Sequence, residues 1–267
     1  MSFRELRRRW SPWWMRSDAR RRGRNILFRH LGIQRCYTPM LLTRSPELTV
    51  RSWLPYVVAH ELANNPQFTF LQIGAFDGVG DDDLRSLITA HPLRGVLLEP
   101  QPLAFSQLQE VYQDQPQLLL LNAAIADREG HRELFCQRGA ASMAASFDRE
   151  HLRRHGIADE DIVAERVVCH TVDSALRAAG LDHVDLIQID AEGYDYEIIR
   201  SIDFSRVRPA IVRFEYRNLS ARDADACLNL LASHGYRFFV EPRDIIAHQV
   251  ADVPQAATIA NARRRSA

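Results

Sequence analysis

The stretch FTFLQIGAFDGVG, residues Phe68–Gly80, decides the fold of this chain. An apolar run typical of a buried strand ends at Gly74, and a glycine-rich turn with one acid, Asp77, follows it. A helical repeat of apolar residues comes next, at Leu84, Leu87 and Ile88. Strand, glycine-rich turn and helix open nucleotide-binding α/β folds, because glycines let the backbone approach a ligand and a helix N-terminus presents free amides.

The glycine spacing in this turn narrows the class of ligand. Gly74, Gly78 and Gly80 read G-x-x-x-G-x-G, whereas a dinucleotide-binding turn reads G-x-G-x-x-G and a P-loop ends in Gly-Lys-Ser/Thr. The turn therefore lacks both phosphate-binding signatures and suits S-adenosylmethionine (SAM), which carries no phosphate. A tight turn without a ligand is the alternative.

The composition is that of a globular protein. The 267 residues are 46% apolar and 25% charged, and the formal net charge of +0 gives no bias toward nucleic acid. The four cysteines have no C-x-x-C spacing, which favours reduced thiols in a cytoplasmic protein over disulfides or a zinc site. We find no apolar run near the roughly 20 residues that span a bilayer, and we expect no signal peptide.

The charge is unevenly distributed. Arginines cluster between Arg4 and Arg24 together with Trp10, Trp13 and Trp14. Arginine and tryptophan together can attach a protein to an anionic membrane surface or an acidic partner, and a solvated tail is the alternative. We therefore predict a basic, partly helical N-terminal extension over residues 1–50, a main domain over 51–250 and a disordered tail over 251–267. The expected location is cytoplasmic, with peripheral contact to the inner face of the membrane.

Candidate binding residues, most of them polar, follow several other strand-like runs. They are Glu99 and Pro100 after Gly95–Leu98, Asn122 and Ala123 after Leu118–Leu121, Asp190 and Glu192 after Val184–Ile189, and Glu215 after Ala210–Phe214. Because the carboxyl ends of parallel strands meet at one edge of an open sheet, we expect these side chains in one crevice with Gly74. A carboxylate such as Glu99 accepts two hydrogen bonds from a vicinal diol, which suits a ribose. Asn122 could bind the ligand or cap a turn.

Other segments are assigned more coarsely. Residues 52–63 predict a helix on the edge of the main domain, and the acids at 81–83 predict charge at a helix N-terminus. Thr171 or Asp173 would cap a helix. The polar segment Ala140–Asp161 lies between two strand-like runs and is expected to be an acceptor region or lid. Two short runs at 237–240 and 245–248 predict a terminal antiparallel hairpin.

Five motifs in this order and spacing resemble the FkbM-type SAM-dependent methyltransferases, over roughly Phe68–Val240. They are Ile73–Gly78, Leu98–Pro102, Asn122–Ile125, Thr171–Asp173 and Ile187–Asp195. The resemblance implies a class I (Rossmann-like) methyltransferase fold, with a mostly parallel seven-stranded sheet and a terminal antiparallel hairpin. It also implies methyl transfer from SAM, usually to a hydroxyl oxygen of a glycan, a lipid-linked saccharide or a secondary metabolite.

The resemblance also implies site residues. It places SAM against Gly74, Ala75, Asp77, Gly78, Glu99, Pro100, Asn122, Ala123 and Asp190. The chain departs from the common family pattern at Gln72, Phe76 and Gln188, where Asp, Asn and Lys are frequent.

The chemistry calls for a general base, because a sugar hydroxyl is a poor nucleophile at neutral pH. The candidates are Asp190, Glu192 and Glu215, with His151 and His170 behind them. Asp190 could instead hold the SAM amine, since a carboxylate beside a cation keeps a low pKa. We predict no metal site, with a divalent ion on the three acids as the alternative.

Two other classes of protein are weighed against this one. A catalytically silent methyltransferase fold could act as a binding or assembly module, although the acids at 99, 190 and 192 argue against that. The glycine spacing disfavours a nicotinamide-dependent enzyme. The expected partner is a saccharide, glycolipid or small-molecule hydroxyl acceptor, with no nucleic acid; the sequence makes no prediction of oligomeric state.

Overall fold

The computed structural model describes residues 52–80 and 82–249, so our expectations for the N-terminal extension and the C-terminal tail lie outside the described residues. The elements in chain order are α4 (Leu54–Asn64), β1 (Thr69–Ile73), α5 (Arg85–Ala90), β2 (Arg94–Leu98), α6 (Pro102–Val111), β3 (Leu118–Leu121), β4 (Ala124–Ile125), β5 (Gly130–Gln137), α7 (Arg149–Arg154), the 3-10 helix η2 (Asp159–Asp161), β6 (Ile162–His170), α8 (Val172–Ala178), β7 (Leu186–Ile189), α9 (Asp195–Ser201), β8 (Ile211–Glu215), α10 (Ala221–Ser233), β9 (Tyr236–Val240) and β10 (Asp244–Gln249).

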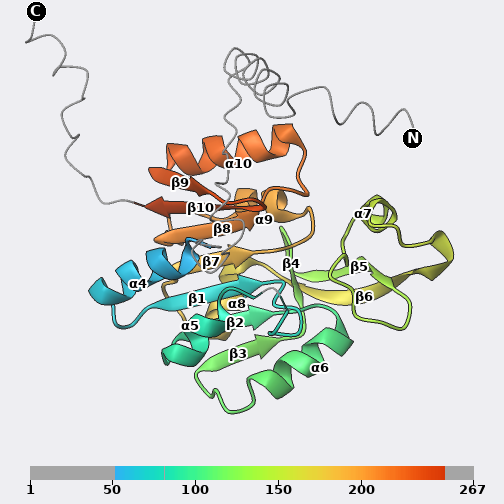
Figure 1. The fold of residues 1–267 in the computed structure, drawn as a ribbon, viewed down its shortest axis with the longest axis horizontal. Helices are drawn as coiled ribbons and strands as arrows, with labels where there is room; N and C mark the ends of the chain where they lie inside the picture. Colours follow the sequence, from blue (N-terminus) through green and yellow to red (C-terminus); the bar gives the residue numbers. More distant parts are fainter. Residues whose placement is uncertain (1–51, 81, 250–267) are drawn as a thin grey trace, which may run out of the picture. The chain divides into compact units, whose positions relative to one another are not determined.

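Seven strands form one sheet in the order β3-β2-β1-β7-β8-β10-β9 (Figure 1). The first five are parallel, β10 runs antiparallel to β8, and β9 runs antiparallel to β10. All residues of β7 and β8 are buried, as expected for parallel strands covered on both faces. The strand order and the antiparallel end confirm the predicted class I methyltransferase fold.

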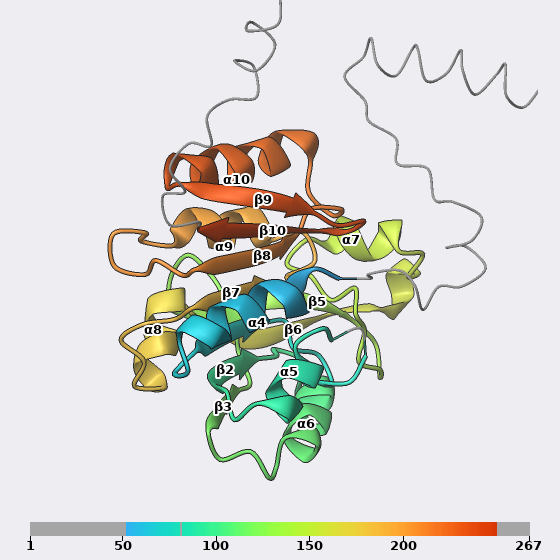
Figure 2. The same ribbon diagram turned by 60° about the vertical axis from the view of Figure 1, so that its left-hand side comes forward.

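Helices cover both faces of this sheet. Apolar residues of α4, α5 and α6 belong to the core on one face, and those of α8, α9 and α10 to the core on the other. We expected the first helix at the edge of the domain, which is wrong. Figure 2 shows α4 crossing the face of the sheet, where Val57 and Val58 share a core with Phe70 of β1 and Ile246 of β10. Its apolar stripe needs a sheet face to cover it.

A smaller sheet, β4-β6-β5, lies beyond the carboxyl ends of the parallel strands (Figure 1). Its buried side is packed by Leu134, Cys136 and Val167. The inserted segment joins β5 to β6 and contains α7 and η2, and Phe135 pairs with Ser146 across it. The segment thus lies between two strands, as predicted, and the structure brings its residues 142–147 next to the tips of β1, β2 and β7. Within the described residues, no helix is long and apolar enough to cross a bilayer.

The acids after the glycine-rich turn divide between two tasks. Asp82 accepts hydrogen bonds from Gln72 Nε2 (3.1 Å) and the Leu84 amide (2.9 Å). Leu84 is the N-cap residue of α5, and the Arg85 amide also hydrogen-bonds Asp82, so this acid lies at the helix N-terminus as predicted. Asp83 instead pairs with buried Arg213 at 2.6 Å, and this guanidinium also contacts Asp244 at 3.1 Å, so Asp83 ties the turn to the sheet. Asp81 lies outside the described residues.

Gly74 is the tightest point of the fold, and its replacement gives a direct test. Its φ is +78°, and a Cβ there would lie 2.0 Å from the Asp190 carbonyl oxygen. Gly156 has nearly the same φ, +80°, with no atom within 4 Å of the added Cβ. We expect Gly156→Ala to cost about 1–2 kcal/mol of unfolding free energy, and Gly74→Ala to cost at least ~1–3 kcal/mol more from the clash.

Urea unfolding followed by circular dichroism measures both variants. Equal losses in the two variants would contradict the close approach of Gly74 to the end of β7.

Candidate active site

A cleft opens where the carboxyl ends of β1, β2 and β7 meet, and the space within and in front of it is about 660 Å³. Its floor comes from the turn after β1 and from the tips of β2 and β7, and the segment 142–147 of the insertion forms its opposite wall. Among the lining residues are Gly74, Phe76, Glu99, Pro100, Gln101, Ala123, Met143, Ser146, Phe147, Asp190 and Glu192. Five of the predicted cofactor-binding positions thus lie on the cleft, namely Gly74, Glu99, Pro100, Ala123 and Asp190.

The other four predicted positions lie outside the lining and shape its backbone. Asp77 Oδ1 accepts hydrogen bonds from the Val79 and Gly80 amides, both at 2.8 Å, and so closes the turn. The side-chain Nδ2 of Asn122 donates to the backbone carbonyls of Glu99 (2.8 Å) and Pro100 (3.1 Å). Ala75 is buried, and Gly78 packs against Leu108 and Tyr112.

Glu99 is fixed at the tip of β2 by backbone donors. Its carboxylate accepts hydrogen bonds from the Phe76 amide (3.0 Å) and the Gln101 amide (2.8 Å). Burial raises the pKa of the Glu99 carboxyl to about 7, although these hydrogen bonds lower it. Phe76 adopts a left-handed φ of +48°, a conformation that Asn tolerates better than a bulky residue. The bond to Glu99 holds this strained turn in place.

Asp190 presents its carboxylate to the open cleft. The side chain is exposed there, and no donor among residues 52–80 and 82–249 lies within hydrogen-bonding distance of its oxygens. Surrounding protein atoms raise the pKa of Asp190 to about 8 by desolvation, and repulsion from Glu192 and Glu215 adds to the shift. A positively charged ligand group would reverse this shift, so the position suits an ammonium.

Glu192 and Glu215 complete an acidic cluster with Asp190. One oxygen from each of the three lies within 4.8 Å of the others. Glu215 lies behind Glu192, and the pKa of Glu215 is raised to about 7 by desolvation and by repulsion from Glu192. His151, His155 and Glu192 form a second close group, so the acids do have histidine neighbours. Either group could hold a metal ion by its donor types.

The two candidate histidines occupy different places. His151 is buried behind the cleft wall, and its Nε2 lies 2.8 Å from Oε2 of Glu192, which does line the cleft. His170 ends β6, and its Nδ1 contacts Ser174 Oγ at 3.2 Å, in the start of α8. His170 is absent from the cleft lining. Thr171 and Ser174 form a capping box at the start of α8, in which each side chain accepts a hydrogen bond from the other residue's backbone amide. This confirms Thr171 as the predicted helix cap.

Sequence reasoning missed two groups that the fold brings to the site. Asn218 donates from Nδ2 to Glu192 Oε2 at 2.7 Å. Gln101 exchanges two hydrogen bonds with Ser142, from its Nε2 to the carbonyl (3.0 Å) and from the Ser142 amide to its Oε1 (2.9 Å). Gln101 thereby fastens the segment 142–147 beside Glu99. The polar composition of the insertion was the sequence feature that indicated this cleft wall. No pattern in the residues around Asn218 indicated that it would contact the site.

A glycine-rich turn, an acid at the tip of β2 and an exposed acid at the tip of β7 define the site of a class I methyltransferase. The sequence model of the methyltransferase FkbM domain matches residues 72–238, so the chain belongs to the FkbM methyltransferase family. The members of this family are methyltransferases, and their cofactor is SAM.

Solved structures of low identity are also similar. A methyltransferase FkbM from Methylobacillus flagellatus KT has 14% identity and a TM-score of 0.45, over 68% of this chain and 44% of that one. The match thus spans less than half of that protein. An O-methyltransferase from Bacillus cereus, in complex with SAH, has 10% identity and a TM-score of 0.41, over 79% of this chain and 88% of that one. No curated protein matches.

The residues present fit SAM. Gly74 lines the cleft, and its lack of a side chain lets the turn after β1 lie against the tip of β7, where Asp190 stands. The unpartnered Asp190 carboxylate suits the methionine ammonium, and Glu99 suits the ribose hydroxyls. Apolar Ala123 and Phe147 line the remaining space.

Loss of the Glu99 carboxylate should weaken SAM binding. We expect Glu99→Ala to lose roughly 1–3 kcal/mol of binding free energy, the size of hydrogen bonds to a charged group. Titration calorimetry with SAM measures it. The control is Glu110→Ala, an exposed acid on α6, which should bind like the wild type. An unchanged dissociation constant for Glu99→Ala would contradict the assignment.

The pKa of Asp190 predicts how SAM affinity depends on pH. A carboxyl with a pKa of about 8 is mostly protonated below pH 7.5 and must lose its proton to pair with an ammonium. SAM affinity should therefore fall about tenfold per pH unit from pH 7.5 to 5.5. Asp190→Asn should bind more weakly with a flatter dependence. Parallel slopes for the two proteins in calorimetric titrations would refute the pairing.

Proposed function

We propose that this protein transfers the methyl group of SAM to a hydroxyl oxygen of a saccharide, in a glycan or glycolipid, or of a secondary metabolite. The observation that carries the proposal is the acidic cluster at the cleft wall, where Asp190 and Glu192 reach the cleft and Glu215 stands behind them. Carboxylates accept hydrogen bonds from hydroxyl groups, and one of them can remove a proton.

Each acid has a separate task in this proposal. Bound SAM supplies an electrophilic methyl group on a sulfonium. Asp190 holds the ammonium of the cofactor and Glu99 its ribose, because these two carboxylates lie on the floor of the cleft. Glu192 accepts the proton of the acceptor hydroxyl. Met143 and Phe147, on the facing wall, exclude water from the reacting oxygen.

The other features of the proposal come from the sequence alone. We infer a cytoplasmic enzyme whose Arg- and Trp-rich N-terminal extension contacts the membrane face, where lipid-linked saccharides lie. A catalytically silent binding module is the second candidate, favoured by the departures at Gln72, Phe76 and Gln188.

An acceptor panel tests the proposal. The full-length protein is incubated with methyl-labelled SAM and the methyl glycosides of rhamnose, mannose, galactose and glucosamine, and SAH and labelled sugar are quantified. We expect O-methylation of at least one sugar, lowered roughly 10²–10⁴-fold in Glu192→Gln and unchanged in Glu110→Gln. Label on the glucosamine nitrogen alone would make the enzyme an N-methyltransferase. SAM binding without transfer to any acceptor would favour the silent module.

A further inference from the structure

One oxygen of the Glu192 carboxylate receives two donors. Oε2 lies 2.8 Å from His151 Nε2 and 2.7 Å from Asn218 Nδ2. No donor among the described residues contacts Oε1. The two oxygens of this carboxylate therefore differ: Oε2 is hydrogen-bonded to protein donors, and Oε1 is free to interact with a ligand.

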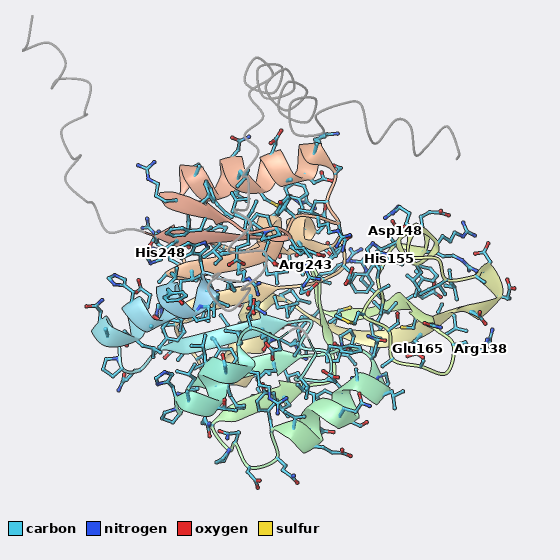
Figure 3. The ribbon with its side chains drawn as sticks, in the orientation of Figure 1. Arg138, Asp148, His155, Glu165, Arg243 and His248 are labelled. Carbon is cyan, nitrogen blue, oxygen red and sulfur yellow. The ribbon has the colours of Figure 1, made fainter. Side chains whose placement is uncertain are left out.

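His151 cannot reach an acceptor itself. The ring is 1% exposed and sits in the first turn of α7, whose ends are marked by Asp148 and His155 in Figure 3. The His155 ring packs on it with 4.3 Å between centroids, and His155 Nδ1 lies 3.0 Å from the His151 carbonyl. This packing fixes the orientation of His151 toward Glu192, so any effect of His151 must pass through that carboxylate.

Asn218 links the two glutamates. Its Nδ2 donates one proton to Glu192 and the other to Glu215 Oε2. An amide nitrogen has two protons, so both are used, and neither glutamate can turn away without leaving a donor unpaired.

The backbone of Glu192 is held as well. Its φ is +46°, in the left-handed region, and Gly193 follows with φ +94°. The Glu192 carbonyl accepts a hydrogen bond from Ser146 Oγ at 2.8 Å. Side chain and main chain are therefore both fixed, which is how a reacting group is kept in one geometry.

We propose that His151 and Asn218 are positioning residues, which hold Oε2 of Glu192 so that Oε1 takes the proton of the acceptor hydroxyl. This inference rests on the proposed function. The O–H proton passes to Oε1, the freed oxygen electron pair bonds the methyl carbon, and the carbon–sulfur pair stays on sulfur as a neutral thioether. Glu192 afterwards returns its proton to solvent through the cleft.

Titratable groups surround Glu192 on three elements. Asp190 faces it from the tip of β7, Glu215 from the end of β8, and His151 and His155 from α7. Removal of His151 or Asn218 as a donor would leave Oε2 with one hydrogen bond instead of two, so the carboxylate would no longer be held in one orientation.

Kinetics of matched variants test the proposal. With the methyl glycoside that the panel identifies, His151→Leu and Asn218→Asp should lower kcat roughly 10–100-fold. SAH affinity should stay within about twofold of the wild type. His151→Gln, which keeps a donor, should recover most of the rate. His91→Gln, at an exposed histidine after α5, is the control and should behave like the wild type. Loss of SAH affinity in parallel with kcat would overturn the proposal in favour of a structural role.

A second measurement needs no acceptor. Long-range ¹H–¹⁵N spectra of ¹⁵N-histidine-labelled full-length protein with SAH report the His151 tautomer, assigned by its loss in His151→Gln. A proton on Nε2 supports the donation to Glu192, and a proton on Nδ1 alone overturns it. An Nε2 proton without methylation of any sugar supports the positioning and overturns only the acceptor class.

A metal ion on Glu192 is the outcome that would replace this mechanism. If EDTA abolished methyl transfer, and Mg²⁺ restored it in the wild type but not in Glu192→Gln, Glu192 would be a metal ligand and the proposal would fall. Unchanged transfer in EDTA supports it.

Discussion

The contact between Gly74 and the end of β7 is the constraint on which the site depends. The Gly74 amide donates to the Leu98 carbonyl, and the Asp190 amide donates to the Ile73 carbonyl, both at 3.0 Å. The main chain is therefore drawn together where β1 lies between β2 and β7, and a side chain at Gly74 would occupy the space of the Asp190 carbonyl. Because this position has no side chain, the acids at the neighbouring strand tips face a common cleft instead of a filled core.

The parts of the site carried by strand tips could be predicted from the sequence. Buried runs rich in Val, Ile and Leu mark parallel strands, and their carboxyl ends share one edge, so Glu99, Asp190 and Glu192 fall together. Contacts made by distant loops gave no such pattern. Asn218 lies three residues beyond β8, and its partner Glu192 is distant in sequence. The face covered by α4 and the pairing of Asp83 with Arg213 likewise depend on tertiary packing, which local spacing does not encode.

Arg213 makes its ion pairs beside the acidic cluster of the cleft. Its guanidinium contacts Asp83, Glu241 and Asp244. Its charge also lowers the pKa of Asp190, and Arg243 acts in the same direction on Glu215. The pKa values of Asp190 and Glu215 nevertheless stay raised, because desolvation and the mutual repulsion of the acids exceed the effect of the two arginines. Arg213 and Glu241 are both buried, so turning the arginine away from its partners would be costly.

Two departures from the family pattern lie side by side. Gln72 and Gln188 are register partners on β1 and β7, and both are buried. Asp and Lys, frequent at these positions in the family, carry opposite charges, whereas the two amides are neutral together. Each amide already meets a charged group, because Gln72 donates to Asp82 and Gln188 accepts from Arg213. A charge introduced on one strand would therefore change the buried surroundings of the residue on the other strand, and the two positions form one unit for substitution.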